Sequence, residues 1–404
     1  MITRRLSGLA GLRALRDPWL SLHASADLYA RYEWHLACAM HLLDASSLAY
    51  VQVLDGARTV AIVPTIVSDA SVSCFHHLRV LTLGLHEQLR LADFPLAADV
   101  RIDEIAAALG TAFAAWPERW DALHWPRILG SSHAMRVARE LRAPAAHIVT
   151  AAPCNTLDMR LPYPELLAGL SKNLRASLRK SQKRLEKSGG EHTTINGVPV
   201  NAVSGAEATL GSAPIDGINA AYEAFLALEN SGWKGATGMG SAVHLNPATR
   251  RFYAELLAQR GPDFVPEVTL LLRGDTPIAA QFSVCVNHCK HVLKIGYHEA
   301  ESRFSPGQVL MARVVELAGG GALECINLVT DMPWHKTWRP NPKQAFRVVA
   351  FRERWRAAPH RGYLAARRAA KFALLAYRSL RARVAAMVLP TPTPGSGPGV
   401  PPDA

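Results

Sequence analysis

The stretch 265–338 constrains the fold more than any other part of the chain. It contains three apolar runs of strand length, rich in β-branched residues and separated by tight turns, which is the signature of consecutive strands. The runs are 267–272, 278–286 and 289–297, and the turns are Gly274-Asp275 and Asn287-His288. The sequence therefore predicts three consecutive strands, the last of which ends at residue 297.

A helix with a defined start and end follows these strands. Ser305 is a capping residue, Pro306 suits the first helical position, and a run of glycines at 319–321 ends the helix. A helix N-terminus presents unpaired N–H groups and the positive end of the helix dipole. We therefore expect the N–H groups of Gly307 and Gln308 to face an anion such as a pyrophosphate. Many helices that begin with Ser-Pro bind nothing, so this loop alone assigns no ligand.

Composition sets outer bounds on the protein. Its 404 residues favour two to three domains, and 49% hydrophobic with 19% charged residues allow a large core. No apolar run is long enough to span a bilayer, and Arg13 and Arg16 interrupt any signal-peptide core, which predicts a cytoplasmic protein. The cysteines lie scattered in apolar contexts, which predicts reduced thiols. They are Cys38, Cys74, Cys154, Cys285, Cys289 and Cys325.

The net charge of +12 is concentrated near the C-terminus, where ten basic residues and one acidic residue lie between 351 and 388. On a helical wheel, Arg367, Lys371, Arg378 and Arg381 share one arc, and apolar residues including Tyr377 share another. Such a helix can lie on an anionic membrane, or it can pack its apolar arc on the body of the protein, which is the interpretation we favour. From residue 390 the chain is rich in Pro, Gly and Thr and is predicted to be disordered.

A short internal similarity predicts two related halves. A strand, a turn at Gly56 and a returning strand in the first part of the chain echo the layout around Gly274. Nothing like Ser-Pro-Gly opens the helix of the first half, so we expect that half to be structural. We place the boundary between the halves at 141–157, where prolines and alanines accumulate.

The most basic compact segment of the body is an amphipathic helix near 172–187. Lys172, Arg175, Arg179 and Lys183 step by three and four along one face, and leucines occupy another. This helix is either a surface helix packed through its leucines or a rim that attracts phosphate-bearing ligands.

Five short phrases occur in a fixed order through the second half of the chain. They are Lys172-Asn-Leu-Arg175 with Leu178-Arg179-Lys180, Leu228-Glu229 with Gly232-Trp233-Lys234-Gly235, Pro277-Ile278-Ala279-Ala280, Ser305-Pro306-Gly307, and Lys336-Thr337-Trp338. In this order and spacing they resemble the GNAT-type acyltransferases of the Fem-like and CelD-like group. The resemblance covers residues 155–345 well and residues 1–150 loosely, and it does not cover the tail.

The resemblance implies an α/β fold of two tandem GNAT-like units, with mixed, largely antiparallel sheets flanked by helices. Residues 1–150 would form a degenerate unit and 155–345 the acyltransferase unit. A basic helical extension at 350–388 and a disordered tail at 390–404 would follow.

The same resemblance implies where an acyl-CoA cosubstrate would bind. The loop would hold the pyrophosphate, and the strand before it would splay to hold the pantetheine. The residues implied are Arg303, Ser305, Pro306, Gly307 and Gln308 in the loop, and Lys294, Ile295 and Gly296 in the strand. The loop shifts the family's glycine by one position and ends in Gln308, so the aminoacyl-tRNA donor of the Fem-like branch stays open. That tRNA is the one nucleic-acid partner we consider.

Acyl transfer needs a base near the acceptor and hydrogen-bond donors at the developing oxyanion. Glu229, Tyr297 and His298 are the candidate catalytic residues, although His298 can equally be a hydrogen-bonded residue at a strand end. The predicted substrate-binding residues are basic, aromatic or polar groups in three segments. They are Lys172, Arg175 and Arg179 in the basic helix, Trp233 and Lys234 after Glu229, and Asp331, His335, Lys336 and Trp338 near the end of the second half.

Cys285, His288, Cys289 and His291 are zinc-ligand types, but they alternate faces in a hairpin, so we predict no metal. Three hypotheses remain. The first is acyl transfer from acyl-CoA to an amine or hydroxyl, with a small molecule, a saccharide or a cell-envelope precursor as acceptor on the resemblance alone. The second keeps the fold and takes aminoacyl-tRNA as donor. The third is a non-catalytic scaffold held at a membrane, on its inner face, or at a polyanion by its basic tail.

Overall fold

The computed structural model describes most of the chain up to Glu353 and separate short pieces beyond it. The described ranges are 1–22, 27–44, 46–73, 76–83, 86, 91–141, 145–200, 215–236, 238–321 and 323–353, with pieces between 355 and 377. The tail 390–404 and the four basic residues Arg367, Lys371, Arg378 and Arg381 lie outside the described residues.

The described strands form one sheet of thirteen strands in the order β1-β2-β3-β4-β5-β13-β6-β12-β11-β10-β9-β7-β8. In the first half they are β1 (Ile2–Ser7), β2 (Leu48–Asp55), β3 (Arg58–Ser73), β4 (His76–Thr82), β5 (Ala122–Leu129) and β6 (Ala145–Asp158). In the second half they are β7 (Glu191–Ile195), β8 (Val198–Val200), β9 (Val265–Arg273), β10 (Thr276–Val286), β11 (Cys289–Tyr297), β12 (Cys325–Asn327) and β13 (Asn341–Phe351).

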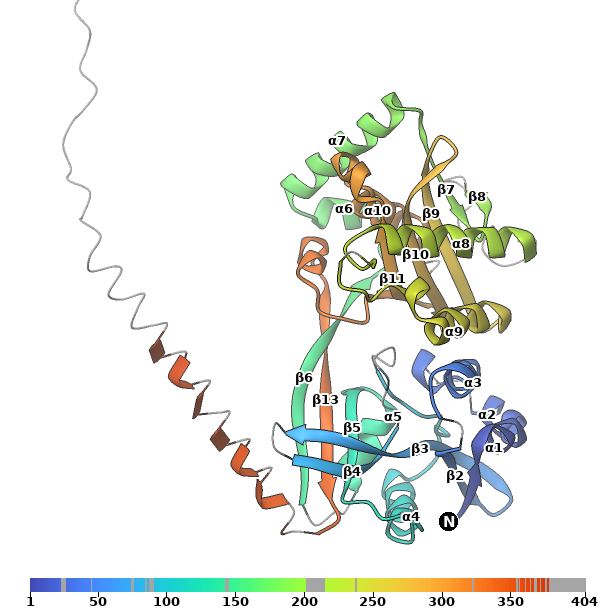
Figure 1. Ribbon diagram of the computed structural model, residues 1–404, viewed down its shortest axis with the longest axis vertical. Coiled ribbons are helices and arrows are strands. Elements are labelled where there is room, and N and C mark those ends of the chain that lie inside the picture. The colour runs from blue at the N-terminus through green and yellow to red at the C-terminus, as the bar shows by residue number, and fades with distance from the viewer. Residues whose placement is uncertain are drawn as a thin grey trace, which may run out of the picture.

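Helices cover this sheet in both halves (Figure 1). In the first half they are α1 (Gly8–Ala14), α2 (Arg16–Leu20), α3 (Tyr32–His41), α4 (Ile102–Ala114) and α5 (His133–Glu140). In the second half they are α6 (Tyr163–Gly169), α7 (Lys172–Lys187), α8 (Ile215–Ser231), α9 (Pro247–Ala258) and α10 (Pro306–Ala318). Short 3₁₀ helices lie at η2 (Leu28–Ala30), η3 (Val243–Leu245), η4 (Glu299–Phe304) and η5 (Pro333–Trp338).

The two halves exchange one strand with each other. β6 follows the strands of the first half but pairs with β12 of the second, and β13 follows the second half but pairs with β5 of the first. These two long strands also pair with each other and run between the halves (Figure 1). The segment 141–157, which we expected to be a boundary, is therefore largely strand β6.

From β2 in the first half and from β9 in the second, the strands follow the same order up to the exchanged strand, which supports the predicted internal repeat. Both contain an antiparallel set followed by a parallel pair, β4 with β5 in the first half and β11 with β12 in the second. The structure has the predicted mixed α/β architecture of two units, with largely antiparallel pairing flanked by helices. The predicted strands and helix of 265–338 are also confirmed as β9, β10, β11 and α10.

Two apolar layers cover opposite faces of the second half. One layer joins α8 and α9 to η2 and α3 of the first half, through residues such as Phe225, Phe252 and Trp34. The other layer packs α7 and α10 against the sheet, and Leu174, Leu178 and Leu185 of α7 are buried there. α7 is thus the amphipathic helix that its leucine spacing predicted, with its basic face outward.

Much of the apolar arc predicted for the C-terminal extension, including Leu380, Val384 and Met387, lies outside the described residues, so its packing stays a prediction. Tyr377, a large member of its apolar arc, is 61% exposed, and Phe372 is 72% exposed. The local helical pattern carried no information about whether the body offers a complementary surface. Across the described ranges, no helix combines the length and apolarity needed to cross a membrane.

A buried ion pair ties β11 to β9 across β10. Lys290 Nζ donates to Glu267 Oε2 at 2.5 Å, and both side chains are almost completely buried. Burial alone would lower the pKa of Lys290, but the Glu267 carboxylate outweighs it and holds the pKa above its usual value. The pair lies inside the sheet, where an unpaired charge is costly.

We predict that Lys290→Met destabilises the protein by about 3–5 kcal/mol, because it leaves the Glu267 carboxylate buried without a partner. Urea unfolding of Lys290→Met and of the double variant Lys290→Met/Glu267→Leu measures this. The double variant is expected to recover most of the loss. A double variant as unstable as the single one would mean that side-chain shape, not the unpaired charge, is responsible.

Candidate functional site

The parallel strands β11 and β12 form a fork. They pair from Cys289 and Cys325 up to His291 and Asn327. Beyond that point, in the described part of the chain, nothing pairs with 292–297 on the β12 side, although β10 continues to pair on the other side. The second half thus presents a strand edge at 292–297 that has no neighbouring strand, which is a ready template for an extended ligand.

A strained residue produces the fork. Val329, just after β12, has φ 61°, which a β-branched residue rarely adopts. Its N–H donates to Asn327 Oδ1 at 2.8 Å, and its carbonyl accepts from Arg127 of the first half at 3.2 Å. The neighbouring Leu328 N–H donates to Asn155 O of β6 at 2.8 Å. The chain after β12 is therefore held on β6 and away from β11.

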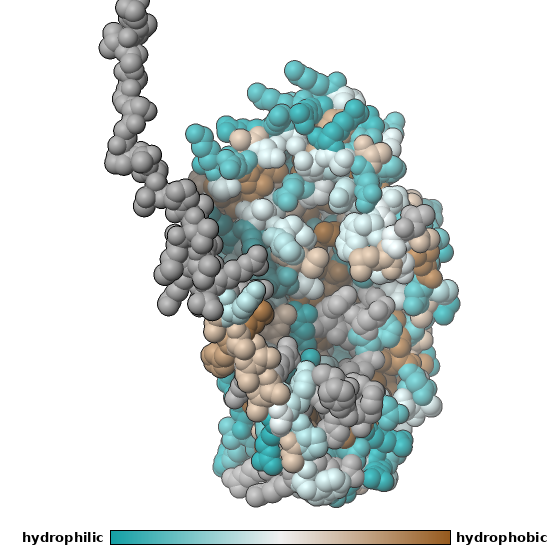
Figure 2. Space-filling view, turned by 60° about the vertical axis from the view of Figure 1, so that its left-hand side comes forward, coloured by the Kyte–Doolittle hydropathy of each residue, from teal (hydrophilic) through white to brown (hydrophobic). Residues whose placement is uncertain are grey.

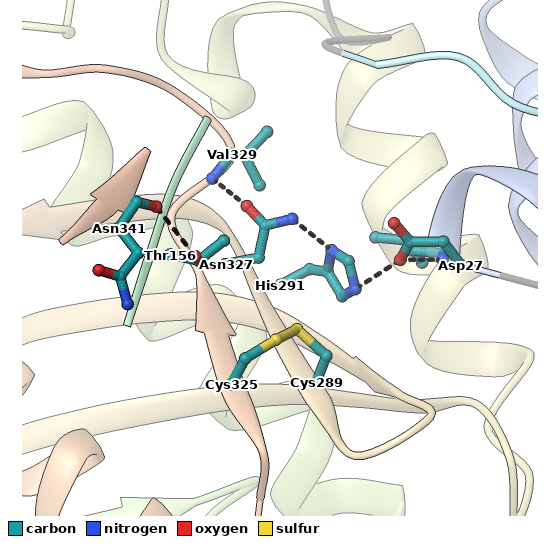
Figure 3. The surroundings of a disulfide bond; sticks show 9 residues. Asp27, Thr156, Cys289, His291, Cys325, Asn327, Val329 and Asn341 are labelled. Carbon is teal, nitrogen blue, oxygen red and sulfur yellow. Dashed lines mark hydrogen bonds and ion pairs between the residues drawn. A yellow bond between two sulfur atoms is a disulfide. The ribbon is translucent and has the colours of Figure 1, made fainter. Parts of the chain in front are cut away.

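A disulfide joins the two strands at the closed end of the fork. Cys289 and Cys325 are register partners and their Cα atoms are 4.7 Å apart (Figure 3). This contradicts the prediction of reduced thiols for these two residues, and it removes Cys289 from any zinc site. Their 36-residue separation hid the contact, which arises from parallel pairing. Cys38, Cys154 and Cys285 are free thiols, and Cys74 lies outside the described residues.

The N-terminus of α10 lies beside the open edge, because a side chain built on Gly307 would be in contact with the Tyr297 ring at 3.8 Å. In the described residues the N–H of Gly307 has no acceptor, which suits an anion. Two details differ from prediction. Gln308 N–H donates to Ser305 O at 2.9 Å, so it does not face outward. Ser305 adopts a left-handed conformation and makes no side-chain cap.

Trp338 and Gln308, which are far apart in sequence, meet at this helix start. The Trp338 indole N–H donates to Gln308 Oε1 at 3.1 Å, and the ring is buried. Arg303 lies three residues before Pro306, the first residue of the helix, and its carbonyl accepts from Arg184 of α7 at 3.0 Å. The loop residues and the basic helix predicted from the sequence are thus brought into one region.

Lys234 reaches the open edge from the loop after α8. Its Nζ donates to Ile295 O at 2.7 Å and to Glu229 Oε1 at 3.1 Å. Glu229 Oε2 accepts from Val243 N at 2.8 Å, and the Glu229 side chain is fully buried. Glu229 therefore differs from the predicted base, since both of its oxygens are engaged. It holds Lys234 in place, and the ion pair could not be inferred from sequence spacing alone.

The remaining predicted residues occupy varied positions. His298 is exposed at the start of η4, Tyr297 is half-buried, and Trp233 is 45% exposed beside Lys234. His335 is buried inside its own loop, where its Nδ1 accepts from Met332 N at 3.2 Å. Burial lowers its pKa, against the opposing effects of Thr330 and Asp331.

Asn155 of β6 links two of the predicted groups and was missed by sequence reasoning. Its Nδ2 lies 2.9 Å from Asp331 Oδ1 and 3.2 Å from His335 Nδ1. Asp331 and Lys336 are exposed, so His335 stabilises the loop that carries them.

A chain of polar contacts at the closed end of the fork was also missed. Asn327 Nδ2 lies 3.4 Å from His291 Nδ1, and His291 Nε2 lies 3.0 Å from Asp27 Oδ1 (Figure 3). Asn327 Oδ1 already accepts from Val329, so its NH₂ group faces His291. Asp27 belongs to the first half. Only the three-dimensional contact between halves reveals it.

The outward face of α7 forms a basic concavity, at the end of the molecule where hydrophilic side chains gather in Figure 2. Its volume is about 410 Å³. It is lined by Arg179, Lys180, Lys183, Arg184 and Lys187. Of the predicted rim residues, Arg179 lines it, whereas Lys172 and Arg175 lie nearer the start of α7. Within the described ranges, no cluster of three or more His, Cys, Asp or Glu side chains could hold a metal ion.

Comparison with known proteins agrees with this architecture. Residues 172–336 match the family model described as an acetyltransferase (GNAT) domain. The solved structure of FemX is similar, with 10% identity, a TM-score of 0.51, and coverage of 86% of this chain and 97% of that chain. No protein of curated function matches the sequence significantly.

Two further solved structures have lower TM-scores. A tandem GNAT protein from the clavulanic acid biosynthesis pathway has 12% identity and a TM-score of 0.45, covering 87% of this chain and 98% of that one. The C-terminal domain of a putative lysylphosphatidylglycerol synthetase from Agrobacterium fabrum has 11% identity and a TM-score of 0.48, covering 88% and 96%.

The fold and the fork define an acyltransferase-type architecture of two units. Residues 172–336 match a GNAT domain, and the chain as a whole shares the fold of FemX.

Gly296 lets the end of α8 approach β11, and this contact generates a prediction. A Cβ on Gly296 would lie 2.8 Å from Glu229 Cα and 2.9 Å from Glu229 N, and these backbone atoms cannot swing aside. We expect Gly296→Ala to lower the free energy of unfolding by about 1–3 kcal/mol. Gly307→Ala, whose Cβ would find ordinary contact, is the matched control. Equal melting temperatures for the two variants would contradict this packing.

Proposed function

We propose that this protein transfers an acyl group from acyl-CoA to an amine or hydroxyl, and that the fork between β11 and β12 is the donor site. The observation that carries the proposal is the open edge of 292–297 beside Gly307. An extended pantetheine arm can hydrogen-bond to a strand edge, and its pyrophosphate can lie at a helix N-terminus. The residues present therefore fit an acyl-CoA. The start of α10 offers the free N–H group of Gly307 but not that of Gln308, which we had also expected to be free.

Lys234 supplies the electrostatic part of the proposed chemistry. Attack on a thioester places negative charge on the acyl oxygen, and a fixed cation beside it lowers the barrier. Lys234 is 15% exposed and is held at the strand edge by Glu229 and Ile295 O. In this proposal Glu229 is a positioning residue, and Tyr297 and His298 remain the candidate groups for proton transfer. The acceptor we propose is a saccharide or a cell-envelope precursor.

Aminoacyl-tRNA is the second candidate donor, and one observation favours it. Pro306 has no N–H and Gln308 N–H is engaged, so the pyrophosphate site is reduced, while the basic concavity on α7 is wide and joined to η4. A polyanion such as tRNA binds through many such phosphate contacts. A membrane contact through the basic extension stays a proposal of its own, supported by the exposure of Phe372 and Tyr377.

Differential scanning calorimetry with acetyl-CoA tests the donor. A ligand at about 100 times its Kd stabilises the native state by about 2.7 kcal/mol, so the melting temperature should rise. Gly307→Glu places a carboxylate at the helix start and is expected to abolish this rise. Gly110→Glu is the matched control, because Gly110 lies in α4 of the first half and also has open space around it.

The changes in melting temperature distinguish acyl-CoA from aminoacyl-tRNA as the donor. A rise in wild type and Gly110→Glu but not in Gly307→Glu supports the fork as a CoA site. The same rise in a folded Gly307→Glu variant would refute that location. If no CoA thioester raises the melting temperature and the protein retains aminoacyl-tRNA on a filter, aminoacyl-tRNA is the donor instead of acyl-CoA.

Charge reversal on α7 tests the basic concavity. We predict that Arg179→Glu/Lys183→Glu weakens acetyl-CoA binding by about tenfold at low salt, because it inverts the potential that attracts phosphates. The loss should shrink toward 1 M salt, where the Debye length is about 3 Å. Lys172→Glu, in the same helix but outside the concavity, is expected to bind almost normally. Turnover lost at unchanged affinity would instead indicate a direct chemical role.

A further inference from the structure

The disulfide at the closed end of the fork encloses both the strand edge and the helix start of the proposed donor site. The chain between Cys289 and Cys325 contains the open edge at 292–297, the 3₁₀ helix η4 and the start of α10 at Gly307. The two cysteines are separated by 36 residues in sequence, and the pairing of their strands brings the Cα atoms to 4.7 Å. One covalent bond therefore closes the loop that carries these parts of the site.

The backbone pairing of β11 with β12 is short. It begins at the two cysteines and ends at His291 and Asn327. Each strand has separate support on its other side, because β11 pairs with β10 along its length and β12 pairs with β6. Cutting the disulfide would therefore leave both strands in the sheet and weaken the contact between them.

The strained turn after β12 depends on that contact. Asn327, the last paired residue of β12, accepts from Val329 N through Oδ1 and lies 3.4 Å from His291 of β11 through Nδ2 (Figure 3). Val329 keeps its left-handed backbone, with φ 61°, only while its surroundings enforce it. If β12 moved relative to β11, part of this support would be lost, and the shape of the fork would change.

The sulfur atoms of this bond belong to half-buried residues, so a small thiol can reach them. They lie next to the exposed turn Asn287-His288. The free thiols of the described residues are less reactive, since Cys38 and Cys154 are buried, and burial raises the pKa of the Cys285 thiol to about 12. Because the thiolate is the form that takes part in exchange, these three thiols compete poorly.

We propose that the Cys289–Cys325 bond is a redox switch, which a dithiol opens and which lowers the affinity of the donor site for acyl-CoA when open. In this effect on acyl-CoA the inference rests on the proposed function. The oxidised protein holds the strand edge and the helix start in place, whereas the reduced protein must order them when the ligand binds.

The chemical step is thiol–disulfide exchange with the dithiol. One thiolate of the dithiol attacks a sulfur of the protein bond, the S–S bond breaks, and the departing cysteine takes a proton. The second thiolate then attacks the mixed disulfide and releases the other cysteine, which also takes a proton. The dithiol is thereby oxidised to a disulfide, and Cys289 and Cys325 are both reduced to thiols.

Dithiothreitol, followed by iodoacetamide and mass spectrometry, tests whether the bond opens in the folded protein. We expect label on Cys289 and Cys325 while the circular dichroism spectrum stays unchanged. Hydrogen–deuterium exchange of this reduced protein should be faster at 325–329, and the amides of β2 and β3 should exchange as before. Label that appears only after unfolding in urea would make the bond a fixed structural cross-link and overturn the switch. Unchanged exchange at 325–329 in the reduced protein would overturn it as well.

Titration calorimetry with acetyl-CoA, after removal of the reagent, measures the effect on the site. We expect reduction to weaken binding by about tenfold, because the ligand must then order the loop, and oxidised glutathione should restore the affinity. Cys289→Ser/Cys325→Ser should bind as weakly as the reduced wild type and should not respond to dithiothreitol. Cys285→Ser is the matched control, because it removes a free thiol from the adjacent β10 and keeps the disulfide, so it should respond as wild type does.

The same measurements separate this inference from the proposed function. If the folded, reduced protein binds acetyl-CoA as tightly as the oxidised one, the switch is refuted and the donor proposal stands. If neither form binds any CoA thioester, the donor proposal fails, and faster exchange at 325–329 on reduction would still show that the bond controls the fork. If reduction unfolds the whole protein, the bond serves global stability and the switch is refuted.

Discussion

The site depends on the point where two parallel strands separate. β11 and β12 are joined at one end by a disulfide and by backbone pairing, and the left-handed Val329 then turns the chain onto β6. A β-branched residue in that conformation costs on the order of 1–3 kcal/mol, and it persists only where its surroundings enforce it. Here Asn327, Asn155 and Arg127 enforce it through hydrogen bonds. The strain keeps a strand edge open inside an otherwise continuous sheet.

The exchanged strands make the two halves one structure. Because β6 lies against β12 and β13 lies against β5, neither half can complete its own sheet alone. Arg127 extends this dependence to the fork, since it is a residue of the first half that bonds to Val329. The first half, which we expected to be only structural, therefore both shapes the fork and places Asp27 at its closed end.

The parts of the fold that could be predicted from the sequence are those that local chemistry decides. Turn residues such as Gly274 and Asn287, which have positive φ, fixed the β9-β10-β11 set, and leucine spacing fixed the buried face of α7. The region around Gly307 was also found, because a loop into a helix N-terminus is a local pattern. Glu229 was predicted as a catalytic residue, and the structure places it in an ion pair with Lys234.

The parts that could not be predicted arise from contacts distant in sequence. The disulfide, the Asp27–His291 contact and the Asn155 hydrogen bonds each join segments that only the sheet order brings together. The pairing of β6 with β12 and β13 likewise joins segments distant in sequence. Ser305 is a further example. Its residue type predicted a helix cap, but its backbone is left-handed and its hydroxyl makes no capping hydrogen bond.

Hydrogen–deuterium exchange with and without acetyl-CoA tests the central claim most directly, because it locates the ligand on the chain. If the fork is the donor site, acetyl-CoA should slow exchange of the unpaired amides in 292–297 and of Gly307, while the amides of β2 and β3 stay unchanged. Protection confined to other segments, with these amides exchanging as in the free protein, would contradict the account.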